Sequence, residues 1–189
     1  IKTVGERKKE NLYTIDLICH GTPSQIMLDM FLKENGHDIS KLTDLKFRKK
    51  TKYYLFYNNK GIKPSNVRDR YTLSFLRSLN YTENCYTCQY ATFERVSDIT
   101  LGDSWGSELP KAEQDKGVSL ILCQSEHGKE LLDMTDLHLV DVDINKAVEN
   151  NKQLSHPSLK NPKREIFLKT FIKSNNFSKS VAKCYPKIC

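Results

Sequence analysis

A short apolar segment that ends in a tight turn sets the fold class of this chain. Leu12 to Cys19 is rich in β-branched and apolar residues and is followed at once by His20-Gly21-Thr22-Pro23. This pattern predicts a strand and its exit. Ser24 then favours the start of a helix that runs to about Glu34, with Ile26, Met27, Met30 and Phe31 on its apolar face. The β-loop-α order predicts an α/β fold with functional groups at the carboxyl end of the strand.

A second strand exit is predicted in the middle of the chain. Ser97 to Leu101 predicts a short strand that ends in Gly102-Asp103-Ser104-Trp105-Gly106. Gly117 to Cys123 predicts a buried strand, with a helix near Glu126 to Met134 after it. Leu137 to Val142 predicts one further strand. Together these segments predict a mixed sheet with flanking helices and a cysteine-containing loop region, in a truncated part of a larger domain.

The remaining segments predict a small meander and several helices. Leu45 to Phe47 and Tyr53 to Tyr57 are strand-like segments around a Lys-rich turn. Helices are expected at Asp69 to Leu79, Ile144 to Asn150 and Arg164 to Lys173. Pro157 and Pro162 mark a linker. We therefore expect one domain over residues 1–156 and a basic helix and tail over residues 157–189.

Charge is distributed unevenly along the chain, although the whole carries a formal charge of +7. Residues 41–63 hold eight Lys and Arg against one acid, and residues 152–189 hold nine against one. Residues 83–149, which contain the close cysteine pair, hold fourteen acids against five bases. A nucleic-acid binder built on a metal knuckle has the opposite arrangement. We expect no nucleic-acid partner and interpret the basic ends as solvated faces.

The cysteines and the apolar segments indicate a cytoplasmic protein. Six cysteines at irregular spacing, without a secretory leader, favour free thiols or metal ligands in a reducing compartment. No apolar segment approaches the roughly 18 to 20 residues of a membrane span. The longest, Val118 to Cys123, has the length of a buried strand, so we expect Cys123 to be buried among apolar side chains. Ile1 as the first residue indicates a fragment.

Cys85-Tyr86-Thr87-Cys88 is the sharpest local signal for chemistry. Two thiolates separated by two residues can bind one metal ion or two corners of a cluster from a single turn. A redox dithiol favours a helix after the first cysteine, whereas the predicted helix precedes this pair. A zinc site needs a second pair or closely spaced histidines, and neither is present nearby. From these residues alone, a zinc half-site, a dithiol and a cluster knuckle stay open.

The first strand exit and the tail contain the other cysteines of interest. Cys19 is either a metal ligand or a small buried hydrophobe at a strand end. His20 either donates a hydrogen bond to a cofactor or orients the turn. Cys184 and Cys189 lie in the basic tail and are not expected to be ligands.

The second strand exit contains a group of candidate cofactor contacts. Its glycines, Gly102 among them, permit the backbone to approach a large ligand closely. Trp105 either covers a cofactor ring or packs as a half-buried aromatic. Asp98 and Asp103 are either cofactor contacts or carboxylates that stabilise turns.

Four segments, taken in order, resemble the C-terminal domain of the coenzyme F420 hydrogenase/dehydrogenase beta-subunit family, of the type found with bacterial polysaccharide biosynthesis. They are Asp16 to Gly21, Cys85 to Cys88, Arg95 to Gly106 and Lys116 to Leu120. The resemblance extends from about Asn11 to about Lys173. Its most specific part is the cysteine pair followed by Asp98-Ile99-Thr100-Leu101-Gly102.

The resemblance implies an iron–sulfur flavoprotein that passes electrons between a 4Fe-4S cluster and FAD. Methanogen members also exchange hydride with the deazaflavin coenzyme, which is therefore a further candidate cofactor. Cys19, Cys85 and Cys88 match three cluster-ligand positions of the family. Cubane clusters take four thiolates, and the fourth is expected from a Gly-Thr-Pro-Cys segment upstream of Ile1. The isolated chain is therefore expected to be inactive.

The remaining expectations concern contacts and partners. The residues on the cofactor side are expected to be His20, Gly21, Thr22, Asp98, Gly102, Asp103 and Trp105. The two strand exits are expected to face one cleft. The sulfur atoms of Cys19, Cys85 and Cys88 are expected within about 7 Å of one another. The partner is expected to be a redox subunit or a ferredoxin-like domain.

Two other functions remain as alternatives. A zinc-stabilised binding module would use its basic ends to contact an acidic partner, and it would contain zinc without iron. A glycosyltransferase or pyruvyl-transfer helper would follow from the polysaccharide context, and it would bind sugar nucleotides without iron.

Overall fold

The computed structural model describes residues 12–49, 52–58, 60–63 and 69–186. They belong to two compact units that alternate along the sequence. Of these described residues, 12–19 and 89–157 belong to the first unit, and those within 20–88 and 158–186 belong to the second. The division of the chain into domains at residue 156 stays a prediction.

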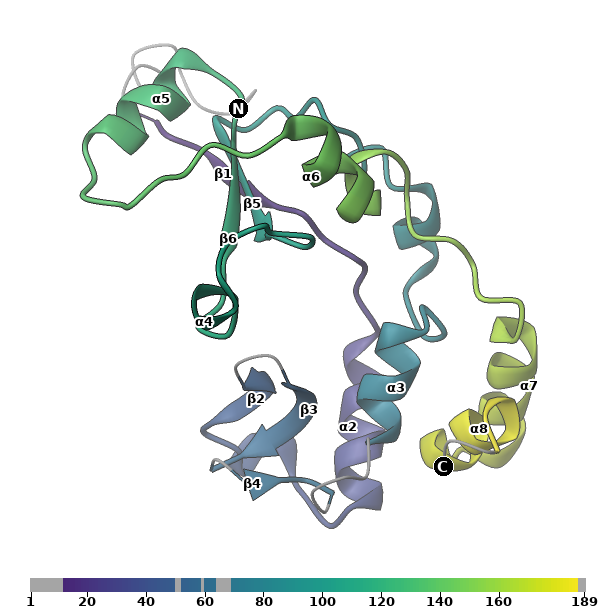
Figure 1. Ribbon diagram of the computed structural model, residues 1–189. Coiled ribbons are helices and arrows are strands. Elements are labelled where there is room, and N and C mark those ends of the chain that lie inside the picture. The colour runs from purple at the N-terminus through teal and green to yellow at the C-terminus, as the bar shows by residue number, and fades with distance from the viewer. Residues whose placement is uncertain (1–11, 50–51, 59, 64–68, 187–189) are drawn as a thin grey trace. The chain divides into compact units, whose positions relative to one another are not determined.

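The first unit is built on a three-stranded mixed sheet (Figure 1). Its order is β1 (Ile15–Leu17), β5 (Ile99–Asp103) and β6 (Ser119–Cys123). β1 runs parallel to β5, with Ile15 opposite Ile99, and β6 runs antiparallel to β5. The mixed sheet with helices around it confirms the predicted α/β fold class.

One face of this sheet packs on a small apolar core. Alternation along β6 buries Leu120 and Leu122, as the two-residue period of a strand predicts. α6 (Ile144–Asn150) and the 3-10 helix η3 (Lys152–Leu154) supply Ala147 and Leu154 to the same core. Two further helices, α4 (Lys111–Gln114) and α5 (Glu126–Asp133), precede and follow β6 in the sequence.

The second unit combines an antiparallel sheet with helices from both ends of the chain. Its strands are β2 (Leu45–Lys49), β3 (Lys52–Tyr57) and β4 (Lys60–Gly61). Its helices are α2 (Gln25–Glu34), α3 (Arg70–Leu76), α7 (Arg164–Ser174), α8 (Phe177–Cys184) and the 3-10 helices η1 (Ile39–Lys41) and η2 (Glu83–Thr87). In the described ranges, no helix has the length and apolar character that crossing a membrane requires.

The core of the second unit joins segments that are far apart in the sequence. Phe31 of α2, Leu55 of β3, Leu73 of α3, Phe167 of α7 and Phe177 of α8 are all buried. The ring centroid of Phe177 lies 5.9 Å from that of Phe31 and 5.7 Å from that of Phe167. Burial of such a side chain contributes roughly 1.5 to 3 kcal/mol. The two C-terminal helices therefore stabilise this unit directly.

Two expectations for the first unit are wrong. Leu137 to Val142 forms no strand, and all of its residues are exposed, because an apolar alternation needs a neighbouring strand to pair with. Cys123 is exposed rather than buried, because it lies on the face of β6 opposite Leu120 and Leu122. Its thiol donates to the carbonyl of Ser125 over 3.3 Å.

Two features of the second unit also differ from expectation. Ile26 is 66% exposed, because α2 turns Leu28 and Phe31 toward the core. A further helix, α8, follows α7 after Asn175, whose left-handed backbone ends α7. The side chain of Asn176 then caps α8 by accepting the N–H of Lys179 over 2.6 Å. Cys184, expected in a loose tail, is buried at the end of this helix.

A buried carboxylate ties α3 to the sheet of the second unit. Asp69 is 1% exposed and caps the N-terminus of α3. Its Oδ1 accepts the N–H of Thr72 over 2.7 Å. Its Oδ2 accepts the hydroxyl of Thr72 over 2.8 Å and the N–H of Leu55 over 2.9 Å. One side chain thus satisfies a free amide in the first turn of α3 and an amide of strand β3.

Asp69→Ala is expected to lower the free energy of unfolding by roughly 2 to 4 kcal/mol, because it removes a cap and leaves buried donors unpaired. Chemical denaturation of wild type and variant measures the loss. The control is Asp143→Ala, because Asp143 caps α6 from an exposed position, and the loss there is expected to be about 1 kcal/mol. Equal losses would contradict the contribution of burial.

Candidate functional site

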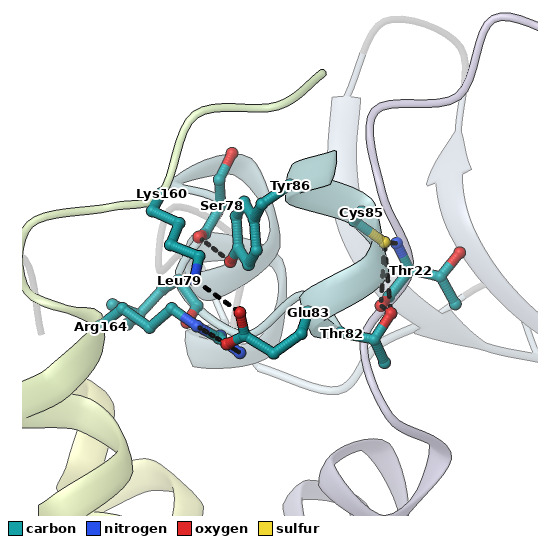
Figure 2. A network of polar contacts seen from close by, with 9 residues as sticks. All are labelled: Thr22, Ser78, Leu79, Thr82, Glu83, Cys85, Tyr86, Lys160 and Arg164. Atoms are coloured by element: carbon teal, nitrogen blue, oxygen red, sulfur yellow. Dashed lines mark hydrogen bonds and ion pairs between the residues drawn. The ribbon is translucent and has the colours of Figure 1, made fainter. Parts of the chain in front are cut away.

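The cysteine pair lies on one turn of 3-10 helix, here named the cysteine loop (Glu83–Cys88). Cys85 is part of η2 and Cys88 follows it directly, and both thiols are free and partly buried. The backbone N–H of Thr22 donates to Sγ of Cys85 over 3.2 Å, and the hydroxyl oxygen of Thr82 lies 3.2 Å from the same sulfur (Figure 2). Such hydrogen bonds orient a sulfur ligand and tune the metal that it binds.

The turn after Cys19 packs directly beside the cysteine loop. Gly21 has a φ of +145°, and a Cβ atom there would overlap the ring of Tyr81. Only glycine fits this position without strain. The N–H of Thr82 donates to the carbonyl of Thr22 over 2.9 Å. The structure thus brings the predicted site residues Gly21 and Thr22 together with the cysteine pair.

Cys19 and His20 are adjacent in sequence but belong to different units. His20 is part of the second unit, where its carbonyl accepts the hydroxyl of Ser158. Cys19 is exposed and is part of the first unit. In the parts of the chain that the structure describes, no three His, Cys, Asp or Glu side chains are grouped to hold a metal ion. The convergence of Cys19 with Cys85 and Cys88 stays a prediction.

A polar network that the sequence analysis missed surrounds the cysteine loop (Figure 2). Glu83 pairs with Arg164 over 2.9 Å and with Lys160 over 2.6 Å. Hydrogen bonds from Lys160, then from Arg164, hold the pKa of Glu83 below its ordinary value. Tyr86 donates its hydroxyl to the carbonyl of Ser78 over 2.8 Å, and burial raises the pKa of this phenol. The only sequence signal for this network was a basic segment after the predicted linker.

The two predicted strand exits leave the sheet of the first unit at the same edge. β1 and β5 are parallel, so their carboxyl ends coincide, and Ile18 still donates to the carbonyl of Leu101 over 2.7 Å. A Cβ atom at Gly102 would lie 2.6 Å from Cδ1 of Ile18. Asp103, the last residue of β5, and Trp105, 41% exposed, follow at this edge. That this edge lines a cofactor cleft stays a prediction.

Asp98 lies at the opposite end of β5. Its Oδ2 accepts the N–H and the hydroxyl of Thr14 over 2.8 and 2.6 Å. Its Oδ1 accepts the hydroxyl of Ser125 over 2.6 Å. These bonds, with that from Ser125 first, hold the pKa of Asp98 below its ordinary value. The carboxylate thus joins the segments before β1 and after β6, and a cofactor contact for Asp98 stays a prediction.

The cysteine loop has the donor set of a metal or cluster site. Two thiols on one turn can bind one metal ion or two corners of a cluster. The amide of Thr22 and the hydroxyl of Thr82 are suited to support a sulfur ligand. For FAD the fit is less direct, because Gly21 and Gly102 allow the close approach of Tyr81 and Ile18. Flavin contacts at the two exits stay a prediction.

One comparison with known proteins gives a match. The family model for the C terminus of the coenzyme F420 hydrogenase/dehydrogenase beta subunit matches residues 2–143. No curated protein and no solved structure matches the chain. The matched region includes Cys19, Cys85 and Cys88 and ends before α6.

Asp98→Asn is expected to lower the free energy of unfolding at neutral pH by about 1 to 2 kcal/mol, because an amide nitrogen cannot accept from Ser125. The folded-state pKa of Asp98 is lowered. Its stabilising effect is therefore complete above the unfolded carboxyl pKa of about 3.9, and it is lost as the pH falls through the folded value. Urea unfolding at several pH values should show the difference shrinking in acid. A difference independent of pH would contradict this role.

Gly21→Ala is expected to lower the free energy of unfolding by roughly 2 to 4 kcal/mol, because the new methyl group meets a left-handed backbone and the ring of Tyr81 together. Gly36→Ala is the matched control. Gly36 also has a positive φ, +77°, but nothing lies within 4 Å of an added Cβ, so we expect a loss of about 1 kcal/mol. Thermal or urea unfolding of both variants measures the contrast, and equal losses would show that the packing on Tyr81 contributes nothing.

Proposed function

Because the chain belongs to the coenzyme F420 hydrogenase/dehydrogenase beta-subunit family, we propose that it is part of an oxidoreductase subunit that transfers electrons between a 4Fe-4S cluster and FAD. Cys19, Cys85 and Cys88 are the proposed thiolate ligands of the cluster. The deazaflavin coenzyme remains a further candidate cofactor, and polysaccharide biosynthesis a candidate context.

The environment of Cys85 is the observation that supports this proposal. Its sulfur lies 3.2 Å from a backbone amide that donates to it and 3.2 Å from a threonine hydroxyl. Hydrogen bonds to the sulfurs are among the factors that set the potential of an iron–sulfur cluster. A cysteine that served only as packing would need no such hydrogen-bond partners.

Chain connectivity supports Cys19 as a companion ligand. Thr22, whose amide donates to Cys85, is three residues after Cys19. Three residues of chain span at most about 11 Å. The length of the chain between Cys19 and Thr22 therefore keeps Cys19 near the turn that contacts Cys85.

The proposed roles of the other residues follow from their positions. When bound, the flavin supplies two-electron chemistry and the cluster supplies one-electron transfer. Thr22 and Thr82 orient the sulfur of Cys85. Asp103 and Trp105, at the edge of the sheet where both strand exits leave, are the proposed contacts on the flavin side, together with His20, Gly21 and Gly102. The proposed role of Asp98 is indirect: its carboxylate accepts hydrogen bonds from Thr14 and Ser125 and so stabilises the sheet that carries these contacts.

The proposed cluster requires a ligand beyond these three cysteines. A cubane takes four thiolates. Among the other cysteines that the structure describes, Cys184 is buried in the core of the second unit, and the thiol of Cys123 is bonded to a carbonyl. Cys189 lies outside the described residues. We infer that the fourth ligand and the rest of the flavin pocket come from elsewhere in the subunit or from a redox partner.

Anaerobic reconstitution of the whole chain with ferric iron, sulfide and an excess of a small thiol, which reduces part of the iron and serves as fourth ligand, tests this proposal. The wild type is expected to bind iron and sulfide and to absorb broadly at about 400 nm. Cys19→Ser, Cys85→Ser and Cys88→Ser are each expected to lower the iron content to about a tenth or less, because each removes a direct ligand. Iron and sulfide analysis with the absorbance spectrum measures this.

Cys123→Ser is the control, because it removes an exposed thiol that the proposal does not use. Its iron content should equal that of the wild type. Iron content that is equally high in Cys85→Ser would refute the ligand assignment. Tight zinc binding with no uptake of iron and sulfide would favour the zinc-stabilised binding module instead.

A further inference from the structure

A segment outside the family match contacts both parts of the cysteine site. Residues 144–189 lie beyond the matched region. Within them, Ser158 donates its hydroxyl to the carbonyl of His20, at the start of the turn that packs on the cysteine loop. Lys160 and Arg164 pair with Glu83, at the start of the loop itself. Residues 158–164 therefore contact both the turn and the loop.

Arg164 makes the most extensive of these contacts (Figure 2). Its side chain is 8% exposed. Nε and Nη2 donate to Oε1 of Glu83 over 3.2 and 2.9 Å, and Nη1 donates to the carbonyl of Leu79 over 2.9 Å. The guanidinium carbon lies 5.0 Å from the ring centroid of Tyr86. One side chain thus contacts the chain before the loop, the first residue of the loop, and one of the two residues between the cysteines.

These contacts restrict the loop at positions that flank Cys85. Glu83 lies two residues before Cys85, and Tyr86 directly follows it. The Tyr86 ring also stacks on Tyr81, with ring centroids 6.1 Å apart, and Tyr81 packs against Gly21 of the turn. Arg164, Tyr86, Tyr81 and Gly21 therefore form one continuous stack. The amide of Thr22, which donates to Cys85, belongs to the same turn as Gly21. This stack therefore restricts the positions of both the Cys85 sulfur and its donor.

Lys160 provides a contrast on the same carboxylate. It reaches Oε2 of Glu83 over 2.6 Å, and its Nζ lies 5.6 Å from the ring centroid of Tyr86, but its side chain is 58% exposed. An exposed ion pair contributes little, because solvent screens it and two flexible side chains must be ordered. The hydrogen bonds of a largely buried guanidinium are charge-assisted and are screened less by solvent. The two cations therefore differ in what they contribute to the loop.

We propose that Arg164 is a positioning residue for Cys85 and Cys88, and that residues 158–164 are an integral part of the cysteine site. The relevance of Arg164 to a cluster rests on the proposed function, but its restriction of the cysteine loop does not. Some groups support metal ligands without touching the metal, and removing such a group typically lowers the metal affinity on the order of 10- to 100-fold. Arg164 acts in this way through Glu83, the Leu79 carbonyl and Tyr86.

Alkylation of the reduced, metal-free chain by iodoacetamide, followed for each cysteine by mass spectrometry, tests the proposal without any cofactor. Arg164→Met is expected to raise the alkylation rate of Cys85 about five- to tenfold, because the loop opens more often when its buried cation is removed. Arg164→Lys, with one donor group in place of the fork, should give a smaller rise. Lys160→Met is the matched control and should change the rate less than about twofold.

The other cysteines of the chain report on alternative causes. Cys184 is 2% exposed in the core beside α7, so its alkylation rate reports unfolding of the helices. Cys123 is an exposed thiol of the other unit and serves as the reference rate. If Cys184 accelerates as much as Cys85 in Arg164→Met, Arg164 is merely structural and the proposal is overturned. An unchanged rate at Cys85 overturns it as well.

A double-mutant cycle tests whether Arg164 acts through its carboxylate partner. Glu83→Gln alone is expected to raise the alkylation rate of Cys85 about as much as Arg164→Lys does. The double variant that combines Glu83→Gln with Arg164→Lys should exceed neither single variant by more than about twofold. Additive increases would show that the two residues act separately, against the proposed route.

The same variants separate this proposal from the proposed cluster. If the wild type takes up no iron and sulfide but Cys85 alkylation depends on Arg164, the cluster is refuted and the positioning role stands. If the wild type takes up iron and sulfide, and neither iron content nor Cys85 alkylation responds to Arg164→Met, the positioning role is refuted and the cluster stands.

Discussion

The hydrogen bonds that join the turn at Thr22 with Thr82 and Cys85 are the constraint on which the candidate site depends. They join segments 60 and 63 residues apart, so the geometry around Cys85 exists only when this pairing forms. Gly21 makes the pairing possible, since any larger residue would overlap the ring of Tyr81. This glycine, which the sequence analysis places on the cofactor side, is therefore also required by packing on the protein itself. The same holds for Gly102 and Ile18.

Local patterns predicted much of the fold. Ser24 marks the start of α2, Asp69 the start of α3, and the apolar segment before Cys19 contains β1. The Asp69 side chain caps α3, whereas Ser24 makes no side-chain cap bond, and short-range periodicity specifies the rest. The errors arise where a distant partner decides the outcome. Leu137 to Val142 has the alternation of a strand but no neighbouring strand among the described residues. The burial of Cys123 depended on which face of β6 met the core, and an apolar segment does not reveal that face.

The proposed ligands of the candidate site were predictable from the sequence, but the residues that hold the cysteine loop in place were not. The spacing of Cys85 and Cys88 is a local signal of metal binding. Glu83 and Arg164 carry no such signal, because they are 81 residues apart and each resembles an ordinary surface charge. The basic composition of residues 152–189 favoured a solvated tail. One of its cations is instead buried against the cysteine loop, a distinction that only the three-dimensional contacts reveal.

The helices beyond the family match have two tasks in the second unit. Phe167 and Phe177 are fully buried in the same core as Phe31 and Leu55, and Arg164 is in the first turn of the helix that carries Phe167. Packing of the two phenylalanines fixes α7 against the core, and a fixed α7 fixes the position of the guanidinium. The loop that bears Cys85 and Cys88 is thereby coupled to the hydrophobic core of its unit. A weakened core would loosen the cysteine geometry even where every residue of the site is intact.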